Sequence, residues 1–187
     1  MSSLDSTFEE LARQFKNPGA LNPAKSDPLF YFVHAPEDTL ELKRKIPLWA
    51  AKFREDAKEV EILSFAALLW QIIDGSNRWD EWLEMEPEHE LSEINEAVQS
   101  VIGGEDALVE AVARHVAVPR PNRVLFLVDA ALAHPYFRLR GLESGLHDRI
   151  KIPTIVFYPG RRLGQYGLRF LGFYAEDPNY RSTLIGE

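Results

Sequence analysis

The sequence contains no cysteine among its 187 residues. Disulfides, thiolate zinc sites and cysteine nucleophiles are therefore excluded, and the composition fits a reducing compartment such as the cytoplasm. The longest apolar runs, Phe65–Trp70 and Val124–Val128, are far shorter than the roughly 18 residues that span a bilayer, so we expect no membrane segment. The stretch Met1–Asp5 carries an acidic residue and no apolar core, which is unlike a signal peptide.

The common nucleotide-binding and hydrolase motifs are also missing. No Gly-Lys pair and no G-x-G-x-x-G occurs, so neither a phosphate loop nor a dinucleotide fingerprint is present. Gly141–Gly145 carries Glu143 where a nucleophile elbow needs serine. The five histidines show no His-Glu-x-x-His spacing, and we expect His115 to pack on a helix rather than to bind zinc. We therefore predict no enzymatic activity, no cofactor and no metal site.

The charge is unevenly distributed along the chain. The net charge is −8, but residues 1–118 hold 11 basic and 23 acidic side chains, whereas residues 119–187 hold 10 basic and 6 acidic ones. The acidic residues are densest at 74–110, with 12 acids against Arg78 alone. Such a segment is typical of a solvated helical face, and a docking surface for a basic partner is the alternative. The acidic part makes broad affinity for nucleic acid improbable.

The apolar patterns predict an α/β protein. Continuous apolar runs at 29–33, 124–128 and 154–158 are typical of buried parallel strands, and 60–62 alternates with acids as an edge strand does. Helical patterns lie between them, including one from a capping box at Ser6–Glu9, one after Pro36 that Pro47 kinks or divides, and one opened by Pro135. We expect a single three-layer domain over residues 1–187, Rossmann-like or P-loop-like, with an acidic helical region at about 74–116.

Two places stand out as binding candidates at the ends of the predicted strands. Asp129 follows an apolar strand, as a metal-side aspartate of a phosphate-loop enzyme does, although such residues more often cap the next turn or helix. The segment Tyr158–Gly172 reads as a glycine-rich, arginine-bearing loop after a strand, where anions are often bound. The alternative is a glycine turn with solvated arginines that leads to an outer strand at 168–174. The candidate partner-binding or anion-binding residues are Arg138, Arg140, Gly160, Arg161, Arg162, Gly164, Arg169, Tyr180 and Arg181.

Trp79 and Trp82 lie three residues apart among acids, on one side of a short predicted helix. Core packing is the commoner role of such a pair. If the pair is partly exposed, it provides rigid anchors for a protein interface, because tryptophan is enriched among binding hot spots.

The C-terminal motifs resemble a known family. The segments Pro135–Arg138, Ile155–Gly160 with Gly164, Leu168–Gly172 and Asn179–Arg181 occur in an order that resembles the BrxB family of bacteriophage exclusion (BREX) systems. The resemblance implies a component of a bacterial system that methylates host DNA and blocks phage replication. It also implies action beside the methyltransferase PglX, the phosphatase-like PglZ and ATPase components.

The resemblance and the missing motifs together favour a non-enzymatic adaptor in the cytoplasm that binds other BREX proteins, with PglZ as the first candidate. A homodimer is plausible. The alternative is a divergent nucleotide- or phosphate-binding protein or hydrolase that uses Asp129 and the C-terminal arginines.

Overall fold

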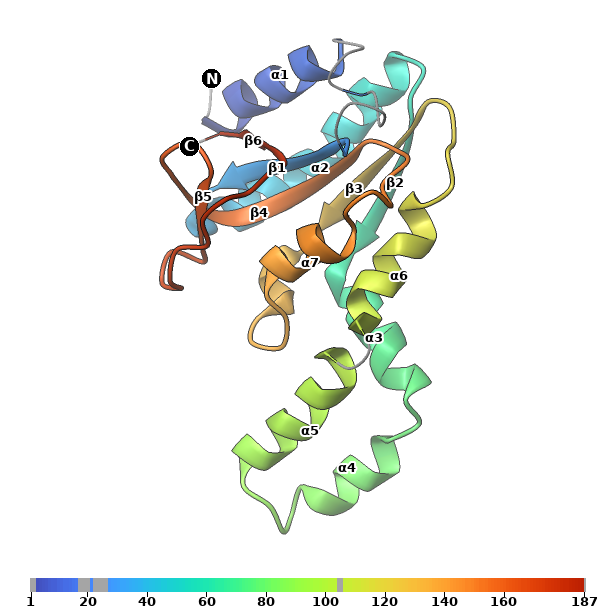
Figure 1. The fold of residues 1–187 in the computed structure, drawn as a ribbon, viewed down its shortest axis with the longest axis vertical. Coiled ribbons are helices and arrows are strands. Elements are labelled where there is room, and N and C mark those ends of the chain that lie inside the picture. Colours follow the sequence, from blue (N-terminus) through green and yellow to red (C-terminus); the bar gives the residue numbers. More distant parts are fainter. Residues whose placement is uncertain (1–2, 17–20, 22–26, 104–105, 187) are drawn as a thin grey trace.

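The computed structural model describes residues 3–16, 21, 27–103 and 106–186. Its centre is a six-stranded, mostly parallel sheet with the strand order β2-β3-β4-β1-β6, in which β5 pairs with β4 outside this path (Figure 1). The strands are β1 (Leu29–His34), β2 (Glu59–Ser64), β3 (Arg123–Val128), β4 (Thr154–Leu163), β5 (Gly167–Phe170) and β6 (Thr183–Ile185). This architecture confirms the predicted α/β class.

Helices cover both faces of the sheet, which makes three layers. The helices are α1 (Ser3–Phe15), α2 (Thr39–Glu55), α3 (Phe65–Gly75), α4 (Trp79–Met85), α5 (Leu91–Gly103), α6 (Ala107–Val116) and α7 (Leu139–Gly145), with the 3₁₀ turns η1 (Pro36–Asp38) and η3 (Ala130–Ala133). The α1 and α2 helices pack on one face, and α3, α6 and α7 on the other. Because alternate residues of β1 enter the two cores, all six of its residues are buried, as in other parallel sheets.

The core against α1 and α2 is aromatic. Phe8 of α1 stacks on Trp49 of α2 with ring centroids 4.6 Å apart, and Trp49 reaches Phe32 and Phe157 of the sheet. Burial of this much apolar area is the main stabilising contribution to the layer.

Several predicted helix boundaries are wrong. The α1 helix begins at Ser3, and the hydroxyl of Ser6 donates to the Ser3 carbonyl, so Ser6 lies inside the helix and forms no capping box. The α2 helix continues through Pro47, so Pro47 does not divide it, and a kink at Pro47 stays a prediction. Pro135 does not open the next helix, because α7 begins four residues later at Leu139.

The β2 strand lies at the edge of the sheet, as predicted, but its exposed and buried side chains differ from the prediction. Ile62 is 43% exposed, whereas Glu61 is half-buried and accepts from Arg123 at 2.6 Å. His115 of α6 also contacts Glu61, at 2.8 Å, so it is tied to the sheet edge rather than simply packed on its helix.

The predicted glycine-rich loop is a β-hairpin. The β4 strand continues through Gly160, Arg161 and Arg162, and β5 returns antiparallel to it, with Arg161 opposite Arg169. The prediction of a loop was wrong because backbone pairing with β5 extends the strand past Pro159. The alternative, a glycine turn that leads to an outer strand, agrees with the turn at Gly164 and with β5. The predicted outer strand at 168–174 is confirmed only as far as Phe170, and β6 was missed.

The acidic segment projects from the sheet. Figure 1 shows α4 and α5 as an arm that extends away from the strands, connected to the body through α3 and α6. The arm contains only two buried apolar side chains, Trp82 and Ile102. Within the described part of the chain, no helix has both the length and the apolar character that a membrane crossing requires.

Candidate functional site

The nine candidate glycine, arginine and tyrosine residues fall into two groups. The hairpin group contains Gly160, Arg161, Arg162, Gly164 and Arg169. The second group surrounds α7 and contains Arg138, Arg140, Tyr180 and Arg181. The structure therefore does not assemble one arginine cluster.

The hairpin group is largely explained by backbone geometry. A Cβ atom at Gly160 would lie 2.3 Å from the carbonyl oxygen of Arg169, and Gly164 has a φ of +64° in the turn. The Arg162 Nε donates to the Gly164 carbonyl at 3.1 Å, whereas Arg161 is mostly exposed and 4.0 Å from Glu37. Anion binding by the hairpin stays a prediction.

The α7 group is mostly engaged within the chain. Arg138 pairs with Asp177 at 3.2 Å, and Arg140 donates to the Pro178 carbonyl while its guanidinium lies 5.2 Å from the ring centroid of Tyr180. Tyr180 is only 1% exposed. Burial raises the pKa of Tyr180, so its hydroxyl stays protonated at neutral pH.

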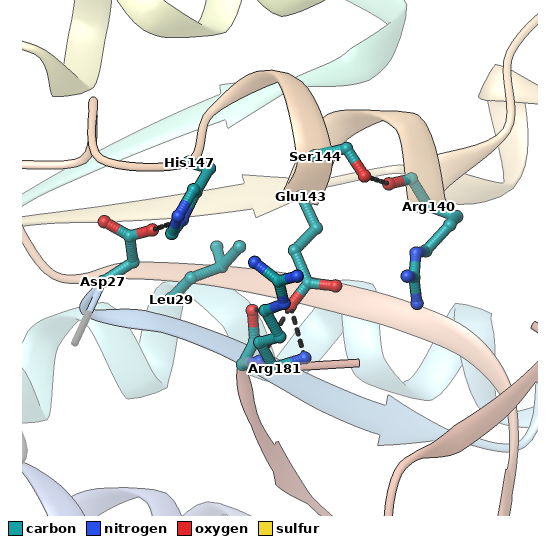
Figure 2. Close-up of a pocket in the computed structure, with 8 residues that line it drawn as sticks. Asp27, Leu29, Arg140, Glu143, Ser144, His147 and Arg181 are labelled. Atoms are coloured by element: carbon teal, nitrogen blue, oxygen red, sulfur yellow. Dashed lines mark hydrogen bonds and ion pairs between the residues drawn. The ribbon is translucent and has the colours of Figure 1, made fainter. Parts of the chain in front are cut away.

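A polar cavity of about 390 Å³ lies beside α7, with Arg140, Glu143 and Arg181 in its lining (Figure 2). One Glu143 carboxylate oxygen accepts from the backbone N–H groups of Arg181 and Ser182, at 2.9 and 2.7 Å, and from the Ser182 hydroxyl. Glu143 therefore fixes the approach to β6. No ion pair or side-chain hydrogen bond holds the Arg181 guanidinium among the described residues.

At one end of this cavity, Asp27 and His147 are joined at 3.0 Å (Figure 2). Asp27, His147 and Asp148 are the one group in the described residues whose ligand atoms lie close enough to hold a metal ion. His147 and Asp148 are exposed, and Asp27 already accepts from the Asp148 backbone N–H at 3.1 Å. No sequence pattern indicates this group, because its members come from two distant segments.

Asp129 lies in a second cavity, of about 380 Å³, at the carboxyl ends of β1, β3 and β4. Its two carboxylate oxygens contact Lys43 of α2 at 2.7 Å and the hydroxyl of Ser64, which donates at 2.6 Å. The predicted capping role is wrong, since the Asp129 side chain makes no hydrogen bond to η3. His34 also lines the cavity, whereas none of the C-terminal arginines does.

An apolar groove of about 330 Å³ lies at the base of the arm, between α3, α4, α5 and η3. It is lined by Ala66, Leu69, Trp70, Ile73, Trp79, Trp82, Val98, Ile102, Leu132 and Tyr136. We call it the aromatic groove. Trp70 stacks on Trp79 with ring centroids 5.7 Å apart, and Trp79 meets Trp82 edge to face at 5.8 Å.

The two predicted tryptophans have different roles in this groove. Trp82 is buried, with 4% exposure, and forms part of the arm's small core. Trp79 is 38% exposed, and its indole N–H donates to Asp74 at 2.9 Å, which fixes the ring. Trp70 and Leu132 are 54% and 49% exposed. The groove therefore leaves large, rigid apolar surface in water, at considerable cost in free energy.

Trp70 was missed from the sequence. Phe65, Leu68 and Leu69 face the core, and Trp70 belongs to a second apolar stripe of α3 with Ala66 and Ile73. Their spacing at i, i+4 and i+7 was the available signal. No sequence pattern indicated Leu132, because only the fold brings η3 beside the arm.

The fold and these surfaces define a three-layer α/β protein with an exposed aromatic groove on an acidic arm. Residues 61–185 match the family described as BREX protein BrxB. The chain therefore belongs to the BrxB family and is a component of a BREX phage-defence system that acts with other BREX proteins. No curated protein and no solved structure matches the chain significantly.

Proposed function

We propose that this chain is a non-enzymatic, cytoplasmic adaptor that binds other BREX proteins, first among them PglZ, and so supports host DNA methylation and phage restriction. The aromatic groove carries this proposal. Trp70 and Trp79 expose aromatic area in a protein whose family acts within a multi-protein system. Partly exposed, rigid tryptophans are the side chains that most often dominate binding energy at protein interfaces.

The engagement of the polar groups supports an adaptor rather than an enzyme. A catalytic carboxylate needs an oxygen that is free to reach the substrate. The Asp129 carboxylate instead contacts Lys43 and Ser64, and the Ser64 hydroxyl also accepts from the Ala66 backbone N–H at 3.1 Å. Ser64 therefore caps α3, and both oxygens of the Asp129 carboxylate are engaged within the protein.

Co-purification tests the proposal. The chain carrying an affinity tag is expressed with each BREX component in turn and with all of them together, and co-eluting proteins are identified by mass spectrometry. We expect stoichiometric co-elution of PglZ or another component, reduced by Trp70→Ala. Leu48→Ala on α2 is the matched control, because Leu48 is 64% exposed and lies outside the groove. Absence of co-elution with every component would contradict the adaptor function.

A phosphate-binding role is the second candidate, favoured by the Asp129 cavity. It lies where ligands bind in open parallel sheets, beyond the carboxyl ends of strands, and it contains Lys43 and His34. Nucleotides should then raise the thermal unfolding midpoint, because a ligand that prefers the folded state stabilises it. Asp129→Asn should abolish that shift, and no shift with any nucleotide in the presence of magnesium would end this candidate.

A further inference from the structure

The surroundings of the aromatic groove are acidic. Residues 74–96 include nine acidic side chains, all exposed, against Arg78 and His89. Arg78 is held by Glu81 through two hydrogen bonds, at 2.8 and 2.5 Å, and His89 lies 3.1 Å from Glu93. The other acids of this stretch form no ion pair with a described residue. The arm therefore carries a large uncompensated negative charge next to an apolar surface.

The groove is preorganised. Three contacts fix its walls: the Trp79 N–H to Asp74, the stack of Trp70 on Trp79, and the hydrogen bond from the Tyr136 hydroxyl to Asn95 at 3.2 Å. Rigid aromatic walls lose little conformational entropy when a ligand binds, so more of the contact energy is available for affinity. A partner therefore meets a formed site.

The α5 helix has a partly exposed apolar face beside the groove. Ile94, Val98 and Val101 are only half-buried, and Leu91 at the start of the helix is 74% exposed. On α4, Leu83 is 59% exposed. Apolar side chains at helical spacing that remain in water are typical of a helix face that packs against another helix.

We infer that the aromatic groove binds a basic amphipathic helix of a partner protein, whose apolar side chains enter the groove and whose lysines or arginines face the acidic side chains of the arm. The inference rests on the proposed adaptor function and specifies the chemistry of its partner. Charge complementarity selects a basic segment and increases the rate of encounter, while the tryptophans supply most of the binding energy.

Charge also argues against a second copy of this chain as the occupant. In a symmetric dimer the same surface faces itself, so the nine acids of one arm would meet those of the other. A head-to-tail contact with the arginines of the hairpin would either close into a ring or extend into a filament with one unpaired groove at its end. A different protein satisfies the groove without either consequence.

Direct binding to synthetic peptides tests the inference on the full chain. The probe is a fluorescein-labelled peptide of about 15 residues, a length at which isolated helices begin to form. It carries leucine at positions i, i+3, i+4 and i+7 and lysine at most other positions. Two matched probes replace the lysines with glutamate or the leucines with alanine. Fluorescence anisotropy measures the affinity of each.

We expect the lysine and leucine peptide to bind, with affinity that falls as salt is added, and both matched probes to bind at least tenfold more weakly. Trp70→Ala and Trp79→Ala should each weaken binding by about tenfold or more, the usual scale for a hot-spot residue. Leu48→Ala should leave it unchanged. Asp80→Lys on the arm should weaken binding, whereas Glu9→Lys on α1 should not. Unchanged thermal unfolding midpoints show that the variants remain folded.

Equal binding by the Trp70 and Leu48 variants would overturn the inference, as would equal binding of the glutamate peptide. A concentration-dependent dimer that Trp70→Ala abolishes would identify a second copy as the occupant and also overturn it. If BREX proteins co-elute with the Trp70→Ala and Trp79→Ala variants as they do with the unchanged chain, the adaptor function stands and the groove inference fails. If the lysine peptide binds but no BREX protein co-elutes, the groove inference stands and the adaptor function fails.

Discussion

Gly160 illustrates how a single residue determines the path of the C-terminal segment. The absence of a side chain lets β5 approach, because a Cβ atom there would lie 2.3 Å from the Arg169 carbonyl oxygen and 2.6 Å from the Tyr158 ring. The sequence marks this glycine as unusual, but it does not distinguish close packing from anion binding. The distinction depends on the partner strand, which the residue pattern alone does not place.

Gly160→Ala should therefore destabilise the protein. We expect the free energy of unfolding in urea to fall by about 1–3 kcal/mol, the usual cost of forcing extra atoms into a packed interior. Gly75→Ala is the control, since a Cβ atom there has no atom within 4 Å, and it should be neutral or slightly stabilising. Equal stability of the Gly160→Ala protein and the unchanged chain would contradict the hairpin packing.

His34 predicts a pH dependence of stability. Burial lowers the pKa of His34 below its ordinary value of 6.5, against the opposing effects of the Ala35 carbonyl and Asp38. The folded state thus favours neutral His34, and the unfolded state binds more protons just below pH 6.5. This contribution to stability is present above pH 6.5 and is lost as the pH falls below it, with a slope of at most about 1.4 kcal/mol per pH unit.

Urea unfolding measured from pH 7.5 down to the acidic side of pH 6.5 checks this dependence. His34→Gln cannot be protonated, so its free energy of unfolding should fall less steeply below pH 6.5 than that of the unchanged chain. Parallel slopes for the two proteins would show that His34 is not the group responsible.

At the scale of elements, the continuous apolar runs of β1, β3 and the first half of β4 were predictable, because strands buried on both faces have a simple composition. The short strand β6 was not. Its three residues are positioned by pairing with β1 and by the hydrogen bonds that the backbone N–H groups of Arg181 and Ser182 donate to Glu143. Neither contact produces a periodic pattern in the sequence, and the hydrogen bond between Asp27 and His147 produces none either.

Glu143→Ala tests the connection between α7 and β6. It leaves two backbone N–H groups without their carboxylate acceptor, so we expect the free energy of unfolding to fall by about 1–3 kcal/mol. Hydrogen exchange at Arg181 and Ser182 should also become faster. Ser144→Ala, next to it on the same helix, removes one long hydrogen bond of 3.4 Å and should change little. Unaltered exchange at both amides would contradict the proposed tie.

On the scale of the whole molecule, the acidic and basic parts of the chain form different parts of the fold. The acidic segment is a projecting arm, and the basic C-terminal part belongs to the sheet and its hairpin (Figure 1). The sequence predicted the acidic helices and two groove tryptophans, Trp79 and Trp82. It could not predict the groove itself, because Trp70, Leu132 and Tyr136 join Trp79 only through the packing of α3, α5 and η3. A partner-binding surface depends on such tertiary contacts more than a short catalytic sequence motif does.

Hydrogen–deuterium exchange of the chain with and without its co-eluting BREX partner tests directly whether the aromatic groove binds that partner. We expect slower exchange in α3, α4 and α5 around Trp70 and Trp79 when the partner is bound, and no such protection with the Trp70→Ala chain. Protection confined to the β4–β5 hairpin or to the α1 and α2 face, with exchange in the arm unchanged, would contradict it.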